Sequence, residues 1–214
     1  MEIVLEVFGD FACFTPSWGK VERTTYPFPT PSAARGILSA VYSKPVEFYW
    51  QVDRIEVLRP IRYMAFKRNE VKDKVKDKPL YTDEDRTQRQ TLALCDVRYR
   101  IAAHIVPQPG FEQRQKSLEE QALRRIQNGK CFYQPSLGMR EFVAYFEESD
   151  GLTLPIPVDL DAGLMLYDVF DLHQCVVTKK AQPKPSLFHA VMRQGVIEVP
   201  PYDSPEVLKG VAPC

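Results

Sequence analysis

Apolar and polar residues alternate along several stretches of this chain, and each such stretch predicts a strand. The first covers Glu2 to Val7. Residues 47–58 are rich in aromatic and β-branched side chains, and residues 90–106 form the longest strand candidate, in which the alternating Arg98 and Arg100 share one face. Shorter strands are expected at 141–146, 164–170 and 196–199.

Two segments instead show helical spacing and helix-end signals. The first begins near Thr30, which can cap it, with Pro31 in the first turn, and it ends before Lys44-Pro45. Its apolar face is Ala33, Ile37, Leu38 and Val41. The second runs from residue 117 to 127, with acidic residues in its early turns and Gly129 just beyond its end.

The order of these elements is strand, helix, strand, a long polar excursion, strand, helix, strand. This order predicts an α+β fold with the ferredoxin-like, split βαβ body that RNA-recognition modules share. We expect residues 1–147 to form that body, with a basic, thumb-like insertion at about 62–90. Residues 148–214 are expected to form a small C-terminal β appendage.

Composition excludes several classes of protein. The chain has 214 residues and is 44% hydrophobic, which excludes a disordered protein. Its apolar runs are shorter than the ~20 residues of a membrane span, and its first residues lack signal-peptide character, so we expect a cytoplasmic protein. Five scattered cysteines without a CxxC pair predict free thiols, and we expect neither a metal site nor a cofactor.

The zero net charge conceals a division along the chain. Residues 1–140 hold 23 Lys and Arg against 17 Asp and Glu, whereas residues 141–214 hold 5 against 11. The basic residues concentrate between 59 and 78, where Tyr63 and Phe66 are interleaved with them. Two readings of this segment have equal weight: a solvated, salt-bridged loop, or an RNA surface on which aromatic rings stack bases and cations hold phosphates.

No phosphate-binding loop, dinucleotide fingerprint, HExxH pair or GxSxG elbow is present. RNA cleavage needs none of these, because the 2′-hydroxyl can attack the adjacent phosphate if the protein supplies proton transfer and positive charge. Tyr42, at the end of the first helix beside Lys44, is one candidate for such a role. The alternative is that Tyr42 only packs, since a phenol with an ordinary pKa of ~10 needs a nearby cation to act as a base.

Eight sequence blocks, in order along nearly the whole chain, carry a resemblance to a known family. They are VFGDFACFT (7–15), KVERTTYPFPTPSAARGILSAVYSKP (20–45), VDRIEVLRPI (52–61), KRNEV (67–71), QRQTLALCDVRYRIAAH (88–104), RRIQNGKCFYQPSLGMREF (124–142), DGLTLPIPVDLDAGLMLYD (150–168) and FHAVMRQGVIEVP (188–200). The sequence thereby resembles the CRISPR-associated Cas-five family in its subtype I-C (d or Dvulg) form, a RAMP-superfamily subunit of the Cascade effector complex.

The resemblance implies a function and partners. Members of this form cut precursor CRISPR RNA within each repeat without metal, leave a 2′,3′-cyclic phosphate, and stay bound to the 5′ handle. They cap one end of the effector complex, where they contact the Cas-seven backbone and Cas-eight large subunits, and they meet target DNA only indirectly. The insertion near 65–90 matches the family's thumb.

The family's catalytic set is a Tyr at the end of the first helix and a Lys-His pair before the second. Tyr42 falls on the Tyr position, but Ser117 and Leu118 stand where the Lys-His pair is expected. Lys116 is one residue away, and His104 is a substitute that folding must bring in. The sequence therefore predicts Tyr42, Lys116 and His104 as catalytic residues, and leaves open a non-catalytic subunit that binds the repeat hairpin and 5′ handle.

Six further residues are predicted to contact RNA. Five are cations in the basic N-terminal part, and the sixth could add a polar contact to a base or sugar. They are Lys20, Arg23, Arg35, Lys67, Arg68 and Asn69. A double-stranded DNA nuclease has little support, because no cluster of carboxylates or histidines suggests a two-metal site.

Overall fold

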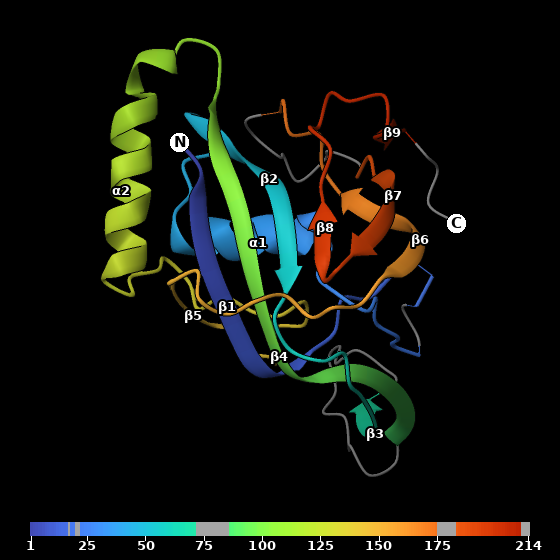
Figure 1. The fold of residues 1–214 in the computed structure, drawn as a ribbon. Coiled ribbons are helices and arrows are strands. Elements are labelled where there is room, and N and C mark those ends of the chain that lie inside the picture. Colours follow the sequence, from blue (N-terminus) through green and yellow to red (C-terminus); the bar gives the residue numbers. More distant parts are fainter. Residues whose placement is uncertain (17, 20–21, 72–85, 175–182, 211–214) are drawn as a thin grey trace, which may run out of the picture.

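A nine-stranded antiparallel sheet organises the residues that this computed structural model describes, which are 1–16, 18–19, 22–71, 86–174 and 183–210 (Figure 1). The elements in chain order are β1 (Ile3–Ala12), α1 (Pro31–Val41), β2 (Phe48–Val57), β3 (Tyr63–Val71), β4 (Arg86–Pro107), the 3₁₀ turn η1 (Glu112–Arg114), α2 (Gln115–Gln127), β5 (Tyr145–Glu148), β6 (Leu160–Asp168), β7 (Ser186–Arg193), β8 (Val196–Glu198) and β9 (Leu208–Lys209).

The first half of the sheet has the order β5-β1-β4-β2. If the arm strand β3 is set aside, these are the fourth, first, third and second strands of a βαββαβ unit. That is the order of a ferredoxin-like sheet, and it confirms the fold expected from the sequence. Register is set by the buried face, since Ile3, Leu5 and Val7 of β1 lie opposite Ala103, Ile101 and Tyr99 of β4.

The C-terminal strands extend the same sheet. β8 pairs with β2, β7 with β8, and β6 with β7. The domain boundary predicted at residue 148 falls at the last residue of β5. Two backbone hydrogen bonds connect the parts on either side of this boundary: Ile156 N donates to Val57 O at 2.9 Å, and Val199 N donates to Asp53 O at 2.9 Å. Residues 148–214 therefore share a backbone hydrogen-bond network with the ferredoxin-like part.

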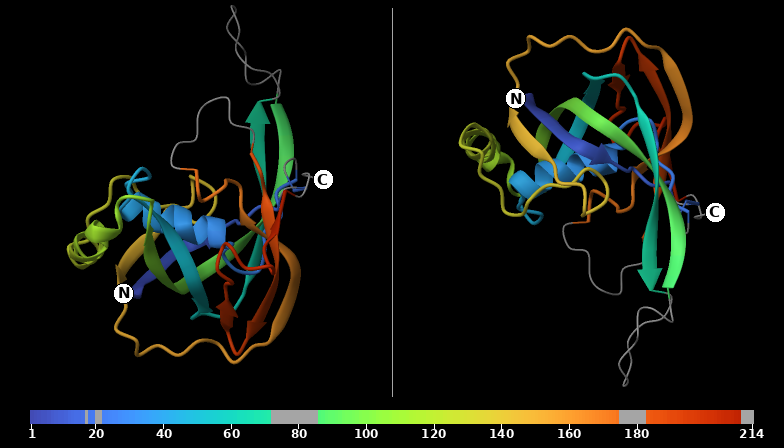
Figure 2. Two further views of the ribbon diagram at one scale, coloured as in Figure 1. Left: turned by 90° about the horizontal axis from the view of Figure 1, so that it is seen from above. Right: turned by 90° about the horizontal axis from the view of Figure 1, so that it is seen from below.

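β3 and the first half of β4 leave the body as a two-stranded arm (Figure 2). Their register runs from Tyr63 opposite Leu94 to Val71 opposite Arg86. The predicted insertion is thus a hairpin stem as far as it is described; residues 72–85 lie outside the described residues.

Both helices lie against one face of the ferredoxin-like sheet (Figure 1). α1 packs on β2 and β6 through Ala34, Ile37 and Leu38, and α2 packs on β1, β4 and β5. Thr30 caps α1 as expected, because its Oγ accepts the amide of Ala33 at 3.1 Å.

Some predicted boundaries were wrong. The strand expected at 141–146 begins only at Tyr145, because the amide of Leu137 binds Phe142 O at 2.8 Å and closes a turn. The strand expected at 164–170 lies at Leu160–Asp168, and β7 was not anticipated at all.

Candidate functional site

Tyr42 ends α1 and is fully buried. Its amide donates to Leu38 O at 2.8 Å, and its carbonyl accepts the indole N–H of Trp50 at 2.8 Å. Its ring stacks between Phe48 and Phe132, with centroids 5.4 and 6.2 Å away. The phenol is therefore held in one orientation by backbone and aromatic contacts.

Three polar side chains of one face of the second helical region gather around this phenol. Tyr42 Oη donates to Gln121 Oε1 at 3.2 Å. One turn later, Arg125 Nε donates to Val41 O at 2.9 Å, and its guanidinium carbon lies 4.1 Å from the Phe132 ring centroid. Arg114, seven residues before Gln121 and so on the same helical face, lies 2.9 Å from Glu47.

Burial raises the pKa of the Tyr42 phenol above its ordinary value, and Glu47 acts in the same direction. The charges of Arg114 and Arg125 oppose that rise in pKa without overcoming it. The phenol therefore stays protonated at neutral pH. It can donate a hydrogen bond, which suits phosphate orientation better than proton abstraction.

An open groove of about 1400 Å³ runs along α1 as far as Ser43, the residue after Tyr42; the buried Tyr42 side chain does not itself line it. Small residues of α1 form its floor, and Arg23, Tyr133 and Arg140 stand at its sides. The loop carrying Tyr133 is tied to α1, because the amides of Phe132 and Tyr133 bind Ala40 O at 2.7 and 3.2 Å. Gly138 closes one wall with φ +85°, where a Cβ would overlap the carbonyl of Cys13, so a larger residue would push this wall outward.

The structure does not bring Lys116 or His104 to Tyr42. Lys116 is exposed in the first turn of α2, five residues and so about 140° around the helix from Gln121. The side chains of Ala103 and Ile105, the neighbours of His104 in β4, face the helices. Because successive side chains of a strand point to opposite faces of the sheet, the His104 side chain projects from the other face. There it is half-buried, with Nδ1 2.7 Å from Asp53 Oδ2, and this hydrogen bond raises its pKa above the ordinary value.

The predicted RNA contacts near α1 have different surroundings. Arg23 lies beside the groove, held by backbone bonds to Gln90 and Leu92. Arg35 instead forms a bidentate ion pair with the buried carboxylate of Asp168, at 2.6 and 2.9 Å. Lys20 lies outside the described residues.

The three candidates on the arm divide between its two faces. Lys67 and Asn69 alternate onto an exposed face of β3, and within the described part of the chain Lys67 makes no ion pair. Arg68 points the other way and is tied to Glu70 at 2.7 Å and Thr91 at 2.9 Å. Arg59 and Arg62, at the base of the arm, both pair with Asp96.

Among the residues that the structure describes, no group of three or more His, Cys, Asp or Glu side chains is placed to hold a metal ion. The thiols of Cys13, Cys95 and Cys131 are free, whereas Cys175 and Cys214 lie outside the described residues. None of the described helices is long and apolar enough to cross a membrane.

Sequence reasoning missed Arg114, Gln121 and Arg125 as partners of Tyr42. Gln121 and Arg125, four residues apart, share one face of the predicted helix, and that signal was readable in the sequence; Arg114 lies before the predicted helix, in the 3₁₀ turn η1. What the spacing alone does not show is that this face turns toward the end of α1 rather than toward solvent.

Comparison with known proteins gives a consistent result over the whole chain. Residues 2–200 match the sequence model of a family described as CRISPR-associated protein (Cas_Cas5), in its Cas5d form. A protein of Thermus thermophilus named CRISPR pre-crRNA endoribonuclease Cas5d is 41% identical over 92% of this chain and 90% of its own length. A protein of the same name from Mannheimia succiniciproducens is 39% identical over 96% and 97%. The crystal structure of a CRISPR-associated protein has the same fold, with a TM-score of 0.68 at 23% identity, covering 97% of this chain and 96% of that one.

Proposed function

The chain belongs to the CRISPR-associated Cas5 family, in its Cas5d form, and from that membership we propose that it is an endoribonuclease that processes precursor CRISPR RNA. The observation that carries this proposal is the identity of 41% and 39%, over nearly the full length, with two proteins named as such endoribonucleases. The cationic surroundings of Tyr42, at the end of a large open groove, provide a site for that reaction.

The groove along α1 is the proposed binding surface for the single-stranded part of the repeat. Arg23 and Arg140 supply positive charge at its sides, and the ring of Tyr133 is 78% exposed, so a base can stack on it. The small side chains of α1 let a sugar-phosphate backbone approach closely. Lys67 and Asn69 extend the proposed RNA surface along the arm.

Cleavage proceeds without metal in this proposal. The 2′-hydroxyl of the RNA gives its proton to solvent water as its oxygen attacks the adjacent phosphorus, the bond to the 5′-oxygen of the next nucleotide breaks, and that oxygen takes a proton from solvent water and leaves as a 5′-hydroxyl. The other product ends in a 2′,3′-cyclic phosphate. Arg114 and Arg125 stabilise charge on the phosphate oxygens, and the protonated phenol of Tyr42 orients the phosphate. Gln121 now accepts the phenol hydrogen, so it must move aside when the phosphate binds.

Lys116 and His104 keep the roles that the sequence predicts only if RNA binding moves them to Tyr42. Lys116 would then stabilise developing negative charge, whereas His104 would have to leave Asp53. We give Arg114 and Arg125 the electrostatic role because their charges already act on the Tyr42 phenol.

A second candidate function is a non-catalytic subunit that holds the hairpin and 5′ handle of CRISPR RNA. Two observations favour it: Ser117 and Leu118 replace the family's Lys-His pair, and Tyr42 is fully buried. In either case we propose that the chain caps an effector complex and contacts its Cas-seven and Cas-eight subunits. The projecting arm of β3 and β4 offers a surface for such a contact.

The deciding experiment incubates the purified protein with a cognate repeat RNA in EDTA. We expect cleavage to a 2′,3′-cyclic phosphate, no cleavage when the attacking 2′-hydroxyl is replaced by hydrogen, and a rate about 100-fold lower in Tyr42→Phe. Tyr145→Phe, which changes an exposed tyrosine on β5, is the matched control and should cut at the normal rate. Tight, salt-sensitive binding without product at protein excess would establish the second candidate.

A further inference from the structure

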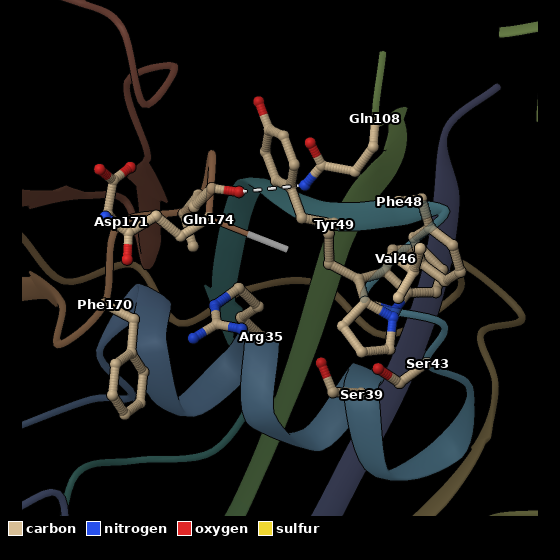
Figure 3. Close-up of a pocket in the computed structure, with 13 residues that line it drawn as sticks. Arg35, Ser39, Ser43, Val46, Phe48, Tyr49, Gln108, Phe170, Asp171 and Gln174 are labelled. Carbon is tan, nitrogen blue, oxygen red and sulfur yellow. Dashed lines mark hydrogen bonds between the residues drawn. The ribbon is translucent and has the colours of Figure 1, made fainter. Parts of the chain in front are cut away.

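A pocket of about 380 Å³ lies on the side of α1 that faces the start of β2 (Figure 3). Its walls come from four parts of the chain: α1, the start of β2 with the segment leading into it, Gln108 just after β4, and the residues that follow β6. In the view of Figure 3, Tyr49 and Gln108 lie across the pocket from Phe170, with Arg35 between them. The volume is at the lower end of the roughly 300–1,000 Å³ of small-molecule sites, so it admits one nucleotide but no helix.

The lining has the composition of a nucleobase site. Tyr49 and Phe170 present aromatic rings, and the Phe170 ring is 38% exposed at the mouth. Phe48 and Trp50 form an almost fully buried floor, so the interior is apolar where a flat ring would lie. Aromatic and apolar walls of this kind stack unpaired bases of RNA.

Gln108 supplies a polar edge to these walls. It is 4% exposed, its Nε2 makes one long bond of 3.4 Å to Leu172 O, and its Oε1 accepts no hydrogen bond from any described residue. A buried carboxamide in this state leaves an acceptor and a second N–H free for a ligand. Glutamine pairs with adenine by accepting from N6 and donating to N7.

The charges at the pocket favour an uncharged ring over a phosphate. Among the described residues that line it, the one basic and the one acidic side chain, those of Arg35 and Asp171, are both already engaged in hydrogen bonds. Arg35 gives Nε and one terminal nitrogen to Asp168, and one carboxylate oxygen of Asp171 accepts from Tyr202 Oη and the amide of His173 at 3.2 and 3.1 Å. An incoming phosphate would meet a carboxylate, whereas a base would not be repelled.

The pocket joins the RNA groove on the other side of α1. Ser39 and Ser43 line both hollows, and Ser43 follows Tyr42 directly in the chain. A strand whose backbone lies in the groove can therefore turn one base past Ser43 into the pocket while its phosphates stay near Arg23 and Arg140.

We propose that this pocket binds one unpaired nucleobase of the RNA, with adenine preferred, next to the phosphate held at Tyr42. Phe170 and Tyr49 stack the ring and Gln108 reads its edge. This inference rests on the proposed RNA-processing function. It adds a position at which the protein selects a base rather than the sugar-phosphate backbone.

The test measures the affinity of the full-length protein for short single-stranded oligoadenylate carrying one fluorescent 8-vinyladenine, which keeps the 6-amino group and N7 of adenine and is quenched when it stacks. Stacking one base on an aromatic side chain is worth about tenfold in affinity. We therefore expect quenching in the native protein, binding about tenfold weaker in Phe170→Ala and Gln108→Leu, and recovery in Phe170→Trp. Leu164→Ala, an exposed apolar residue of β6, is the matched control.

Two comparisons test whether the bound base belongs to RNA or to a free nucleotide, and whether the pocket binds a base at all. Free AMP should bind more weakly than oligoadenylate, because it cannot use the groove; equal affinities would point to a free-nucleotide site and overturn the RNA assignment. Unchanged oligoadenylate binding in Phe170→Ala would also overturn it. Binding and cleavage of repeat RNA are measured in parallel. If the native protein cuts repeat RNA while the pocket variants bind oligoadenylate normally, only the pocket inference fails. If the native protein neither binds nor cuts repeat RNA, the proposed function itself is contradicted.

Discussion

Arg125 holds the end of α1 and contributes positive charge at Tyr42 at the same time. Its guanidinium donates to the carbonyl of Val41 and lies over Phe132, which itself stacks on Tyr42. In Arg125→Met the side chain still covers the ring but loses the charge. Because removing one preorganised donor at a developing oxyanion typically costs a factor of about 100 to 1,000, we expect the cleavage rate to fall by that amount.

The neighbouring Arg124 provides the control for this prediction. It carries the same charge but is exposed and lies off the Arg114, Gln121 and Arg125 face. Arg124→Met should lower the cleavage rate less than threefold. Single-turnover rates on repeat RNA check both variants, and equal losses in the two would show that only overall charge matters.

The pair of His104 and Asp53 predicts a pH-dependent stability. The hydrogen bond to Asp53 raises the pKa of folded His104 above the value of about 6.5 in an unfolded chain. The stabilisation is therefore complete below about pH 6.5 and is lost as the pH rises through the folded pKa. Because the pair is partly solvent-exposed, it contributes at most about 1 kcal/mol.

Urea unfolding of the native protein and of Asp53→Asn, from about pH 5.5 to 8.5, checks the sign of this prediction. The difference in unfolding free energy should be largest at the acidic end and shrink toward the alkaline end. A difference that grows with pH would contradict the assignment. His104→Gln should remove the same pH dependence and leave repeat cleavage within about twofold, since His104 lies on the face away from Tyr42.

At the scale of the element, the arm predicts that neighbouring cations of β3 act differently. Lys67 is exposed, whereas Arg68 is held by Glu70 and Thr91. Lys67→Gln should weaken repeat RNA binding and reduce the slope of log affinity against log salt by about 0.7 to 0.9, because one phosphate contact is lost. Arg68→Gln should leave that slope nearly unchanged and make the arm easier to cleave with protease.

Fluorescence anisotropy over a salt series measures both slopes, and limited proteolysis measures the opening of the arm. Asn69→Ala shares the exposed face with Lys67 but carries no charge, so it should change affinity without changing the slope. If Arg68→Gln instead shows the larger loss of slope, Arg68 leaves Glu70 on binding RNA and the assignment of the two faces is wrong.

The elements themselves were largely predictable from the sequence. The aromatic and β-branched residues of 47–58 and the long strand candidate at 90–106 mark β2 and β4, and Thr30-Pro31 marks the start of α1 through local capping. The side-chain partners of the site residues could not be predicted, because they depend on tertiary contacts. The partners of Tyr42 depend on how α2 docks, and Arg35 meets Asp168 across 133 residues of sequence. No local pattern contains either contact.

At the scale of the whole molecule, part of the positive charge of residues 1–140 is neutralised by acidic residues of the same part inside the fold. Arg98 and Arg100 of the basic part pair with Glu6 in the interior, and Arg100 also binds Glu56 at 2.6 Å. Because these guanidinium groups are engaged in ion pairs within the fold, they are not available to bind RNA. We therefore expect the RNA contacts to come from other cations, along the α1 groove, beside Tyr42 and on the arm.

Arg35 and Asp168 form a further ion pair, which joins the two parts of the chain. The carboxylate of Asp168 is 2% exposed, and it also accepts the amide of Phe170 at 2.9 Å, which positions that ring at the pocket mouth. Arg35→Met leaves the buried carboxylate without its counter-charge. Since removing one partner of a buried ion pair costs about 3–5 kcal/mol, and Arg35 is partly solvated, we expect a loss of about 3 kcal/mol in unfolding free energy.

The double variant Arg35→Met/Asp168→Asn separates this electrostatic cost from lost packing. Without the charge at residue 168, nothing buried is left uncompensated, so the double variant should be more stable than Arg35→Met by about 1–2 kcal/mol. Urea unfolding measures the native protein, Arg35→Met, Asp168→Asn and the double variant. A double variant as unstable as the sum of its two single changes would show that Arg35 and Asp168 act independently.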